Sequence, residues 1–237
     1  MERLSASSAS KHMACHASAN LAAAIPNWTP PEIDPNANTA ANRGTAMHDT
    51  FASLMVLPVS DVKNFSDALS YVAEVRSRRR FQSLIEHEMR VDWLKTKPST
   101  TADLVLYTQD EMHIIDLKTG KIPVSVAENP QLLYYAATYG FLAPKAKGVT
   151  LHIVQPWADV MEEWYADAAR IQQFMLDAQA AEFAIQQGST MFQPGDHCTF
   201  CAANPHGRGA KGSPKCPAMM QLLYPSFTDE AEILKGD

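Results

Sequence analysis

Two short, mainly apolar segments of the chain, residues 102–107 and 112–117, are separated by a polar stretch around Gln109-Asp110. Short apolar segments on either side of a polar turn are typical of two paired strands. The pattern therefore predicts a β-hairpin. Residues 86–94, which alternate over a short length, and residues 149–154 are predicted to form two further strands.

Apolar residues three or four positions apart predict helices elsewhere. We expect one helix over residues 45–54, capped by Thr45, and a second over residues 66–75. Asn129 caps a third, in which Pro130 takes the favourable first position. The apolar face of the second helix consists of Leu69, Val72 and Val75.

Three longer segments complete the organisation of the chain. Residues 25–43 are interrupted by four prolines and read as a loop, and the Gly- and Pro-rich residues 194–216 are expected to be irregular. Residues 159–187 are expected to form one long helix or two broken ones. Because strands and helices alternate along 237 residues, we expect one α/β domain with a mixed central sheet flanked by helices.

The composition is that of an ordinary soluble globular protein, with 46% hydrophobic and 19% charged residues. No apolar run is long enough to span a bilayer, and residues 1–18 lack the continuous apolar stretch of a secretory signal. We therefore expect no membrane partner and a reducing, cytoplasmic location.

The formal net charge of -6 argues against nonspecific coating of nucleic acid, because Lys and Arg drive phosphate binding. Two basic clusters could still supply a local groove. The first consists of Arg76, Arg78, Arg79 and Arg80, and the second of Arg208, Lys211 and Lys215. A solvated helix surface and a flexible loop are the alternative interpretations of these clusters.

The hairpin register places two acids opposite each other. A two-residue turn at Gln109-Asp110 pairs Asp103 with Asp116 on one face, about 5 Å apart. Two carboxylates so placed repel each other unless a cation lies between them, and Mg²⁺ or Mn²⁺ favour carboxylate oxygen. Lys118 shares the face of Asp116. Two acids and an ammonium at a strand end suit phosphodiester hydrolysis; the alternative is a surface hairpin with solvated side chains.

The order of these residues resembles the PD-(D/E)XK nuclease superfamily, in particular its RecB-like branch. The matching motif begins with a histidine on an early helix, His48, followed by Asp103 and then Asp116-Leu117-Lys118. A Gln-x-x-x-Tyr pair, Gln131 and Tyr135, follows on the next predicted helix and shares one helical face. The resemblance implies a restriction-endonuclease-like fold with a catalytic core over residues 48–155.

The resemblance also implies residue roles. His48, Asp103 and Asp116 would bind the metal, with the Leu117 carbonyl as a further ligand, and Lys118 would be the catalytic lysine. On the strand at 86–94, Glu86 and Glu88 share a face, and we prefer Glu88 as an additional acid of the site. The sequence departs from the family pattern where Ala102 precedes Asp103 and where the second acid is Asp.

The four cysteines form a second motif: Cys15, the Cys198-x-x-Cys201 pair and Cys216. In a reducing compartment such spacing indicates metal binding rather than disulfides. The arrangement resembles the iron-sulfur nucleases of the RecB-like branch, CRISPR-associated and AddB-type. There, four cysteines hold a 4Fe-4S cluster that joins the chain ends. The corresponding segments here are 1–24 and 194–217. Structural Zn²⁺ is the alternative, and His16, His197 or His206 could replace a cysteine.

Together these features predict a Mg²⁺- or Mn²⁺-dependent deoxyribonuclease, with exonuclease action on single-stranded or double-stranded DNA ends. The absence of a helicase region suggests a stand-alone enzyme of a phage or prophage, with a recombination protein as partner in a bacterial host cell. The alternatives are a noncatalytic nucleic-acid-binding or scaffold protein with the same fold, and a zinc-stabilised interaction module.

Overall fold

A computed structural model describes residues 4–24, 45, 47–49, 52, 63–204 and 216–223 of the chain. The chain divides into two compact units. We call the first the terminal unit; it comprises Met1–Pro30, Leu94–Pro98 and Leu176–Asp237. We call the second the sheet unit; it comprises Pro31–Trp93 and Ser99–Met175. The expectation of a single domain stays a prediction.

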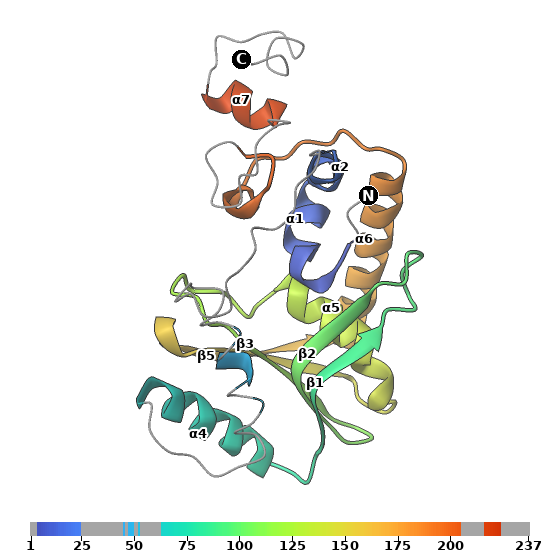
Figure 1. The fold of residues 1–237 in the computed structure, drawn as a ribbon. Coiled ribbons are helices and arrows are strands. Elements are labelled where there is room, and N and C mark those ends of the chain that lie inside the picture. Colours follow the sequence, from blue (N-terminus) through green and yellow to red (C-terminus); the bar gives the residue numbers. More distant parts are fainter. Residues whose placement is uncertain are drawn as a thin grey trace. The chain divides into compact units, whose positions relative to one another are not determined.

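The sheet unit contains five strands in the order β1-β2-β3-β4-β5 (Figure 1). β3 and β4 run parallel, and the other neighbouring pairs are antiparallel, so the predicted mixed sheet is confirmed. The strands are β1 (Gln82–Arg90), β2 (Ser99–Tyr107), β3 (Met112–Leu117), β4 (Gly148–Gln155) and β5 (Val160–Asp167).

The hairpin of β2 and β3 has the predicted register. Tyr107 pairs with Met112 and Leu104 with Ile115, and the Thr108 amide closes the turn by donating to the Glu111 carbonyl at 2.8 Å. Because side chains alternate along a strand, Asp103 projects from the face opposite to that of Leu104.

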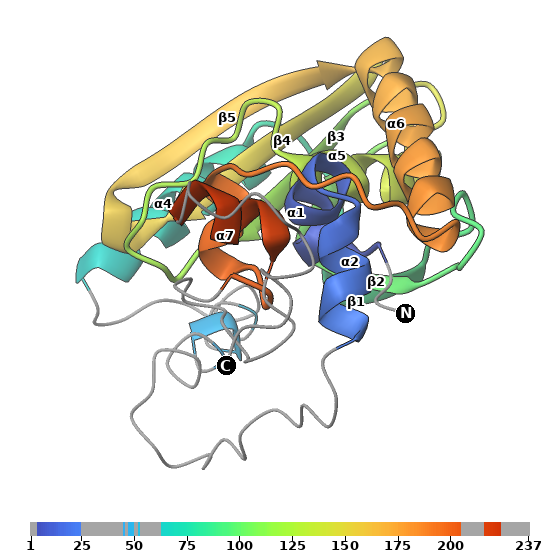
Figure 2. The ribbon, with the colours of Figure 1, turned by 90° about the horizontal axis from the view of Figure 1, so that it is seen from above.

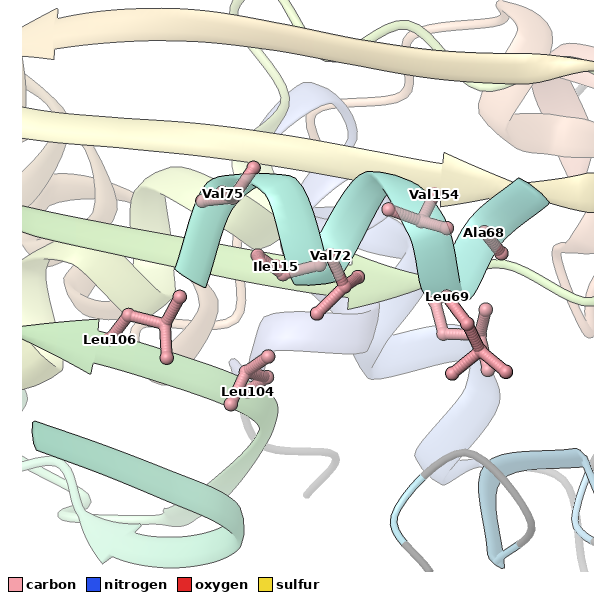
Figure 3. Packing of buried hydrophobic residues seen from close by; sticks show 9 residues of the cluster. Ala68, Leu69, Val72, Val75, Leu104, Leu106, Ile115 and Val154 are labelled. Atoms are coloured by element: carbon pink, nitrogen blue, oxygen red, sulfur yellow. The ribbon is translucent and has the colours of Figure 1, made fainter. Parts of the chain in front are cut away.

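Helix α4 (Lys63–Ser77) covers one face of the sheet (Figure 3). Its predicted apolar face is confirmed, since Leu69, Val72 and Val75 are buried against side chains of β2, β3 and β4, including Leu104 and Ile115. The helix begins three residues before the predicted start at Ser66. Figure 2 gives the view from above, in which β4 and β5 lie in front of α4.

Helix α5 (Pro130–Tyr139) lies between β3 and β4 in sequence and packs on the other face of the sheet (Figure 1). Its predicted start is confirmed, because the Asn129 side chain accepts hydrogen bonds from the amides of Gln131 at 3.0 Å and Leu132 at 3.3 Å. The short 3-10 turns η2 (Gly140–Leu142) and η3 (Pro156–Ala158) flank β4. Leu104 and Ile115 face α4, so the neighbouring Asp103 and Asp116 project from the opposite face of the sheet, toward α5.

The prediction of helix throughout residues 159–187 was wrong in its first part. Residues 160–167 form strand β5, and only Ala168–Gln186 form the helix α6. β5 satisfies backbone groups along β4, and this long-range pairing outweighs local helical periodicity. The predicted strand at 86–94 was also displaced, because β1 spans Gln82–Arg90.

The terminal unit contains short helices around the cysteines. They are η1 (Ala6–Ser8), α1 (Ala9–Ala14), α2 (Ala17–Ala23), η4 (Asp196–Phe200) and α7 (Pro217–Leu223). The C-terminal half of α6 contributes Glu182, which is buried and accepts hydrogen bonds from the amides of Lys95 at 2.8 Å and Thr96 at 2.9 Å.

Several predictions fall outside the described residues: the loop at 25–43, Phe51 and Leu54 of the first predicted helix, and the cluster Arg208, Lys211 and Lys215. Thr45, Met47, His48, Asp49 and Ala52 are described and are helical. Among the described helices, none combines the length and the apolar character needed to cross a bilayer.

Candidate active site

Asp103 is held at the centre of the site by the neighbouring strand. It is 7% exposed, and its Oδ2 accepts a hydrogen bond from the Leu117 amide at 2.6 Å. That contact fixes the carboxylate and leaves Oδ1 directed toward His48, whose Nδ1 lies 3.5 Å away. Asp103 thus links β2, β3 and the helical segment that carries His48.

Glu86 is the third group of the cluster. Its Oε1 lies 3.6 Å from His48 Nδ1, and ligand atoms of His48, Glu86 and Asp103 all lie within 4.8 Å of one another. Glu86 takes a left-handed backbone conformation, with φ 44°, at the β1 position between the pairs Ile85–Leu104 and His87–Ala102. It therefore stands opposite Asp103.

Glu88, the acid preferred from the sequence, is placed differently. It pairs with Thr101, two residues farther along β1, and it is not part of the group of ligand atoms that His48, Glu86 and Asp103 form. Both glutamates are exposed, so exposure does not separate them. The geometry selects Glu86 in its place. The choice could have been made only by aligning β1 against β2, because the two glutamates share one face of an isolated strand and local sequence does not separate them.

The electrostatics of this cluster favour a positive charge. The hydrogen bond to Asp103 raises the pKa of His48, with further contributions from the charges of Asp103, Glu86 and Asp116, whereas burial opposes the shift. Burial and the neighbouring Asp103 charge raise the pKa of Glu86. Carboxylates that are hard to ionise side by side become easier to ionise when a cation is bound.

The second half of the site joins β3 to α5. Lys118 Nζ lies 2.8 Å from Asp116 Oδ2 and donates to Gln131 Oε1 at 2.7 Å. Gln131 Nε2 donates to Asp116 Oδ1 at 3.1 Å and to the Tyr135 hydroxyl at 2.8 Å. Gln131 therefore bridges the lysine, the acid and the tyrosine.

Asp116 is 2% exposed. Burial raises the pKa of Asp116 to about 6, and the opposing effect of Lys118 only partly offsets this. Its Oδ2 forms an ion pair with Lys118 Nζ at 2.8 Å, so the lysine already balances part of the charge on this buried carboxylate.

The sequence-predicted residues are thus only partly brought together. His48 and Asp103 meet, but Asp116 lies outside the group of three within 4.8 Å and contacts Lys118 and Gln131 instead. The Leu117 amide holds Asp103, and its carbonyl as a metal ligand stays a prediction. Burial raises the pKa of Tyr135, which keeps its hydroxyl protonated.

The cysteines gather in the terminal unit. All four are free thiols that line one small cavity of about 10 Å³, roughly the space of one water molecule. The Gly195 amide donates a hydrogen bond to Cys198 Sγ at 3.4 Å. Burial raises the pKa of Cys201 and Cys216, so free thiols at these positions stay protonated. Among the described residues, the cysteines are not one of the groups whose ligand atoms all lie within 4.8 Å of one another, and a metal bound by these thiols stays a prediction.

Two arginines of the cluster at the end of α4, Arg78 and Arg79, form ion pairs with acids. Arg78 Nη1 lies 2.8 Å from Glu163, and Arg79 Nη1 lies 2.9 Å from Glu111. These exposed ion pairs favour the interpretation of this cluster as a solvated surface rather than a groove for phosphates.

Two solved structures resemble the chain at low similarity. One, from Eubacterium rectale and described as a "Putative exonuclease", covers 95% of this chain and 94% of its own, with 10% identity and a TM-score of 0.47. The other, SSO0001, covers 72% of this chain and 81% of its own, with 14% identity and a TM-score of 0.35. Likeness at this level assigns no function.

The sequence itself matches a family model. The family described as "Protein of unknown function (DUF2800)" matches residues 58–223, a range that includes Asp103, Asp116 and Lys118. The chain therefore belongs to the DUF2800 family.

Proposed function

We propose that the protein is a divalent-metal-dependent nuclease of the PD-(D/E)XK type that hydrolyses phosphodiester bonds in DNA. The observation that carries the proposal is the convergence of His48, Glu86 and Asp103, next to a buried Asp116 that is paired with Lys118 at 2.8 Å. Imidazole nitrogen and carboxylate oxygen suit Mn²⁺, and carboxylate oxygen suits Mg²⁺.

The residues of the site have different roles in the proposed reaction. His48, Glu86 and Asp103, joined by Asp116, would hold the cation, which when bound lowers the pKa of a coordinated water and offsets charge on the phosphate. Lys118 is positioned to orient the attacking water or to stabilise negative charge in the transition state. Gln131 fixes the lysine through the 2.7 Å hydrogen bond to its Nζ.

The test is digestion of end-labelled DNA with Mn²⁺ by the wild type and by Asp116→Ala and Lys118→Ala. We expect each variant to lose activity by about 100-fold or more. Lys145→Ala, which alters an exposed lysine at the opposite end of β3, is the matched control and should retain activity. Equal digestion by the wild type and both site variants would refute the proposal. The labelled products also report whether cleavage is exonucleolytic, as the sequence resemblance implies.

We further propose that Cys15, Cys198, Cys201 and Cys216 bind a 4Fe-4S cluster, on the strength of the sequence resemblance. The alternative, a single Zn²⁺ ion, needs less room and suits the small cavity. Iron, sulfide and zinc contents of protein purified without oxygen decide between them. Four iron and four sulfide per chain support the cluster, whereas one zinc per colourless chain refutes it.

A noncatalytic nucleic-acid-binding or scaffold protein is the second candidate. It would keep the cysteine site but not need the bridge that Gln131 forms between Lys118 and Asp116. DNA binding without cleavage under every divalent ion would favour this candidate.

A further inference from the structure

Gln155, the last residue of β4, is fully buried although its side chain is an amide. A buried amide is costly unless it is hydrogen-bonded. Its Oε1 accepts a hydrogen bond from the Val124 amide at 3.0 Å, and its Nε2 donates to the carbonyls of Gly120 at 2.8 Å and Ile122 at 2.7 Å. The whole amide is therefore used to hold one short segment of backbone.

That segment follows Lys118 directly. β3 ends at Leu117, and the Lys118 amide extends the contact with β4 by donating to the Val154 carbonyl at 2.9 Å. Residues 119–126 form neither helix nor strand. Gln155 thus supplies to residues 120–124 the hydrogen bonds that a sheet would otherwise supply, and it reduces the conformational freedom of the backbone next to the lysine.

The held segment presents its side chains outward. Ile122 is 53% exposed, and Lys121 and Pro123 are also exposed. Lys121 forms no ion pair with any residue that the structure describes. Three residues of chain span at most about 11 Å, so Lys121 stays close to Lys118. A lysine on a fixed backbone at that distance suits contact with a phosphate of a bound strand.

We propose that Gln155 is a positioning residue that fixes residues 120–124 as a substrate-binding loop, in which Lys121 contacts a phosphate of the nucleic acid. The inference rests on the proposed nuclease function. It adds two roles: Gln155 maintains the alignment of Lys118 with Asp116, and Lys121 contributes to substrate affinity rather than to the chemical step.

The first variant is Gln155→Leu, which keeps a similar volume and removes all three hydrogen bonds. We expect kcat to fall about tenfold or more, because small displacements of catalytic groups are costly. The second position is tested by Lys121→Ala. It should raise KM, leave kcat unchanged, and reduce the salt dependence of DNA binding by about one phosphate contact.

Two control variants separate positioning from stability and from general charge. Glu182 is also a buried side chain that holds backbone, because it accepts hydrogen bonds from the amides of Lys95 and Thr96 in the terminal unit. Glu182→Gln weakens these bonds, so it should lower thermal stability without lowering kcat. Lys145→Ala removes an exposed lysine at the opposite end of β3 and should not change KM or the salt slope.

The outcomes are distinguishable in steady-state digestion of end-labelled DNA with Mn²⁺. An active wild type whose kcat is unchanged in folded Gln155→Leu would overturn the positioning role. An unchanged salt slope in Lys121→Ala would overturn the phosphate contact. An inactive wild type would overturn the proposed function, and with it the inference that depends on it.

Discussion

At the scale of single residues, the two glutamates of β1 differ in their surroundings. Glu86 has φ 44° and lies 3.6 Å from His48, whereas Glu88 pairs with Thr101 two residues farther along the strand. A left-handed conformation costs a residue other than glycine about 1 kcal/mol or more. Glu86 keeps it where its carboxylate joins a cluster of potential ligands, which supports a role for this side chain in metal binding.

This contrast gives a matched pair of variants. We expect Glu86→Gln to raise the Mn²⁺ concentration needed for half-maximal cleavage by about tenfold or more, because a charged ligand becomes neutral. Glu88→Gln should leave the Mn²⁺ requirement unchanged. Titration of activity with Mn²⁺ measures both, and equal shifts in the two variants would contradict the assignment of Glu86.

Gln131 gives a second residue-scale prediction. Gln131→Leu removes the contacts with Lys118, Asp116 and Tyr135, so we expect kcat to fall about 100-fold while the fold remains. Gln172→Leu, on the exposed surface of α6, is the control and should behave as the wild type. Wild-type kcat in Gln131→Leu would show that the bridge does not support catalysis.

At the scale of elements, the hairpin and α5 were predictable because their signals are local. A two-residue turn sets the register of β2 and β3, and an Asn-Pro start defines α5. β5 was not predictable in the same way, because it is stabilised by pairing with β4. The spacing of its own apolar residues does not reveal that pairing or the turn between the two strands. The approach of His48 to Glu86 is likewise a long-range contact that no local pattern encodes.

The cap of α5 leads to a stability prediction. Asn129→Ala removes the one side-chain oxygen that accepts from the amides of both Gln131 and Leu132, so the free energy of unfolding should fall by about 1 kcal/mol. Urea denaturation measures the change. Because Gln131 lies in the first turn, we also expect a lower kcat; an unaltered midpoint and kcat would show that the cap is dispensable.

The packing of α4 gives a second element-scale prediction. Leu69 is 5% exposed in the core between α4 and the sheet, and Leu69→Ala should lower the free energy of unfolding by about 2–4 kcal/mol. Leu176 is 51% exposed, and Leu176→Ala should change the free energy of unfolding by less than about 0.5 kcal/mol. Similar urea midpoints for the two variants would contradict the described core.

At the scale of the whole molecule, a buried chain of polar groups links stability to pH. His152 is fully buried, with Nδ1 2.9 Å from the Tyr71 hydroxyl and Nε2 2.9 Å from His113 Nδ1. Burial lowers the pKa of His152 to about 3 from its ordinary value of 6.5. Between these values the unfolded chain binds more protons at this position, so stability falls as pH falls from about 6.5 toward 3.

We expect this histidine to contribute a slope of up to about 1.4 kcal/mol per pH unit within that window. Urea denaturation across the window, with His152→Gln as the comparison, measures it. The variant should have a lower stability near neutral pH and a shallower acid dependence. Parallel curves for the two proteins would assign the acid sensitivity to other groups.

The account depends most on the cation held by His48, Glu86 and Asp103, and calorimetric titration with Mn²⁺ measures that cation directly. Asp103→Asn keeps an acceptor for the Leu117 amide and removes one negative charge, so it isolates metal binding from folding. We predict saturable Mn²⁺ binding to the wild type and affinity lower by about tenfold or more in Asp103→Asn. Equal affinities, or no binding by the wild type, would contradict the proposed metal site.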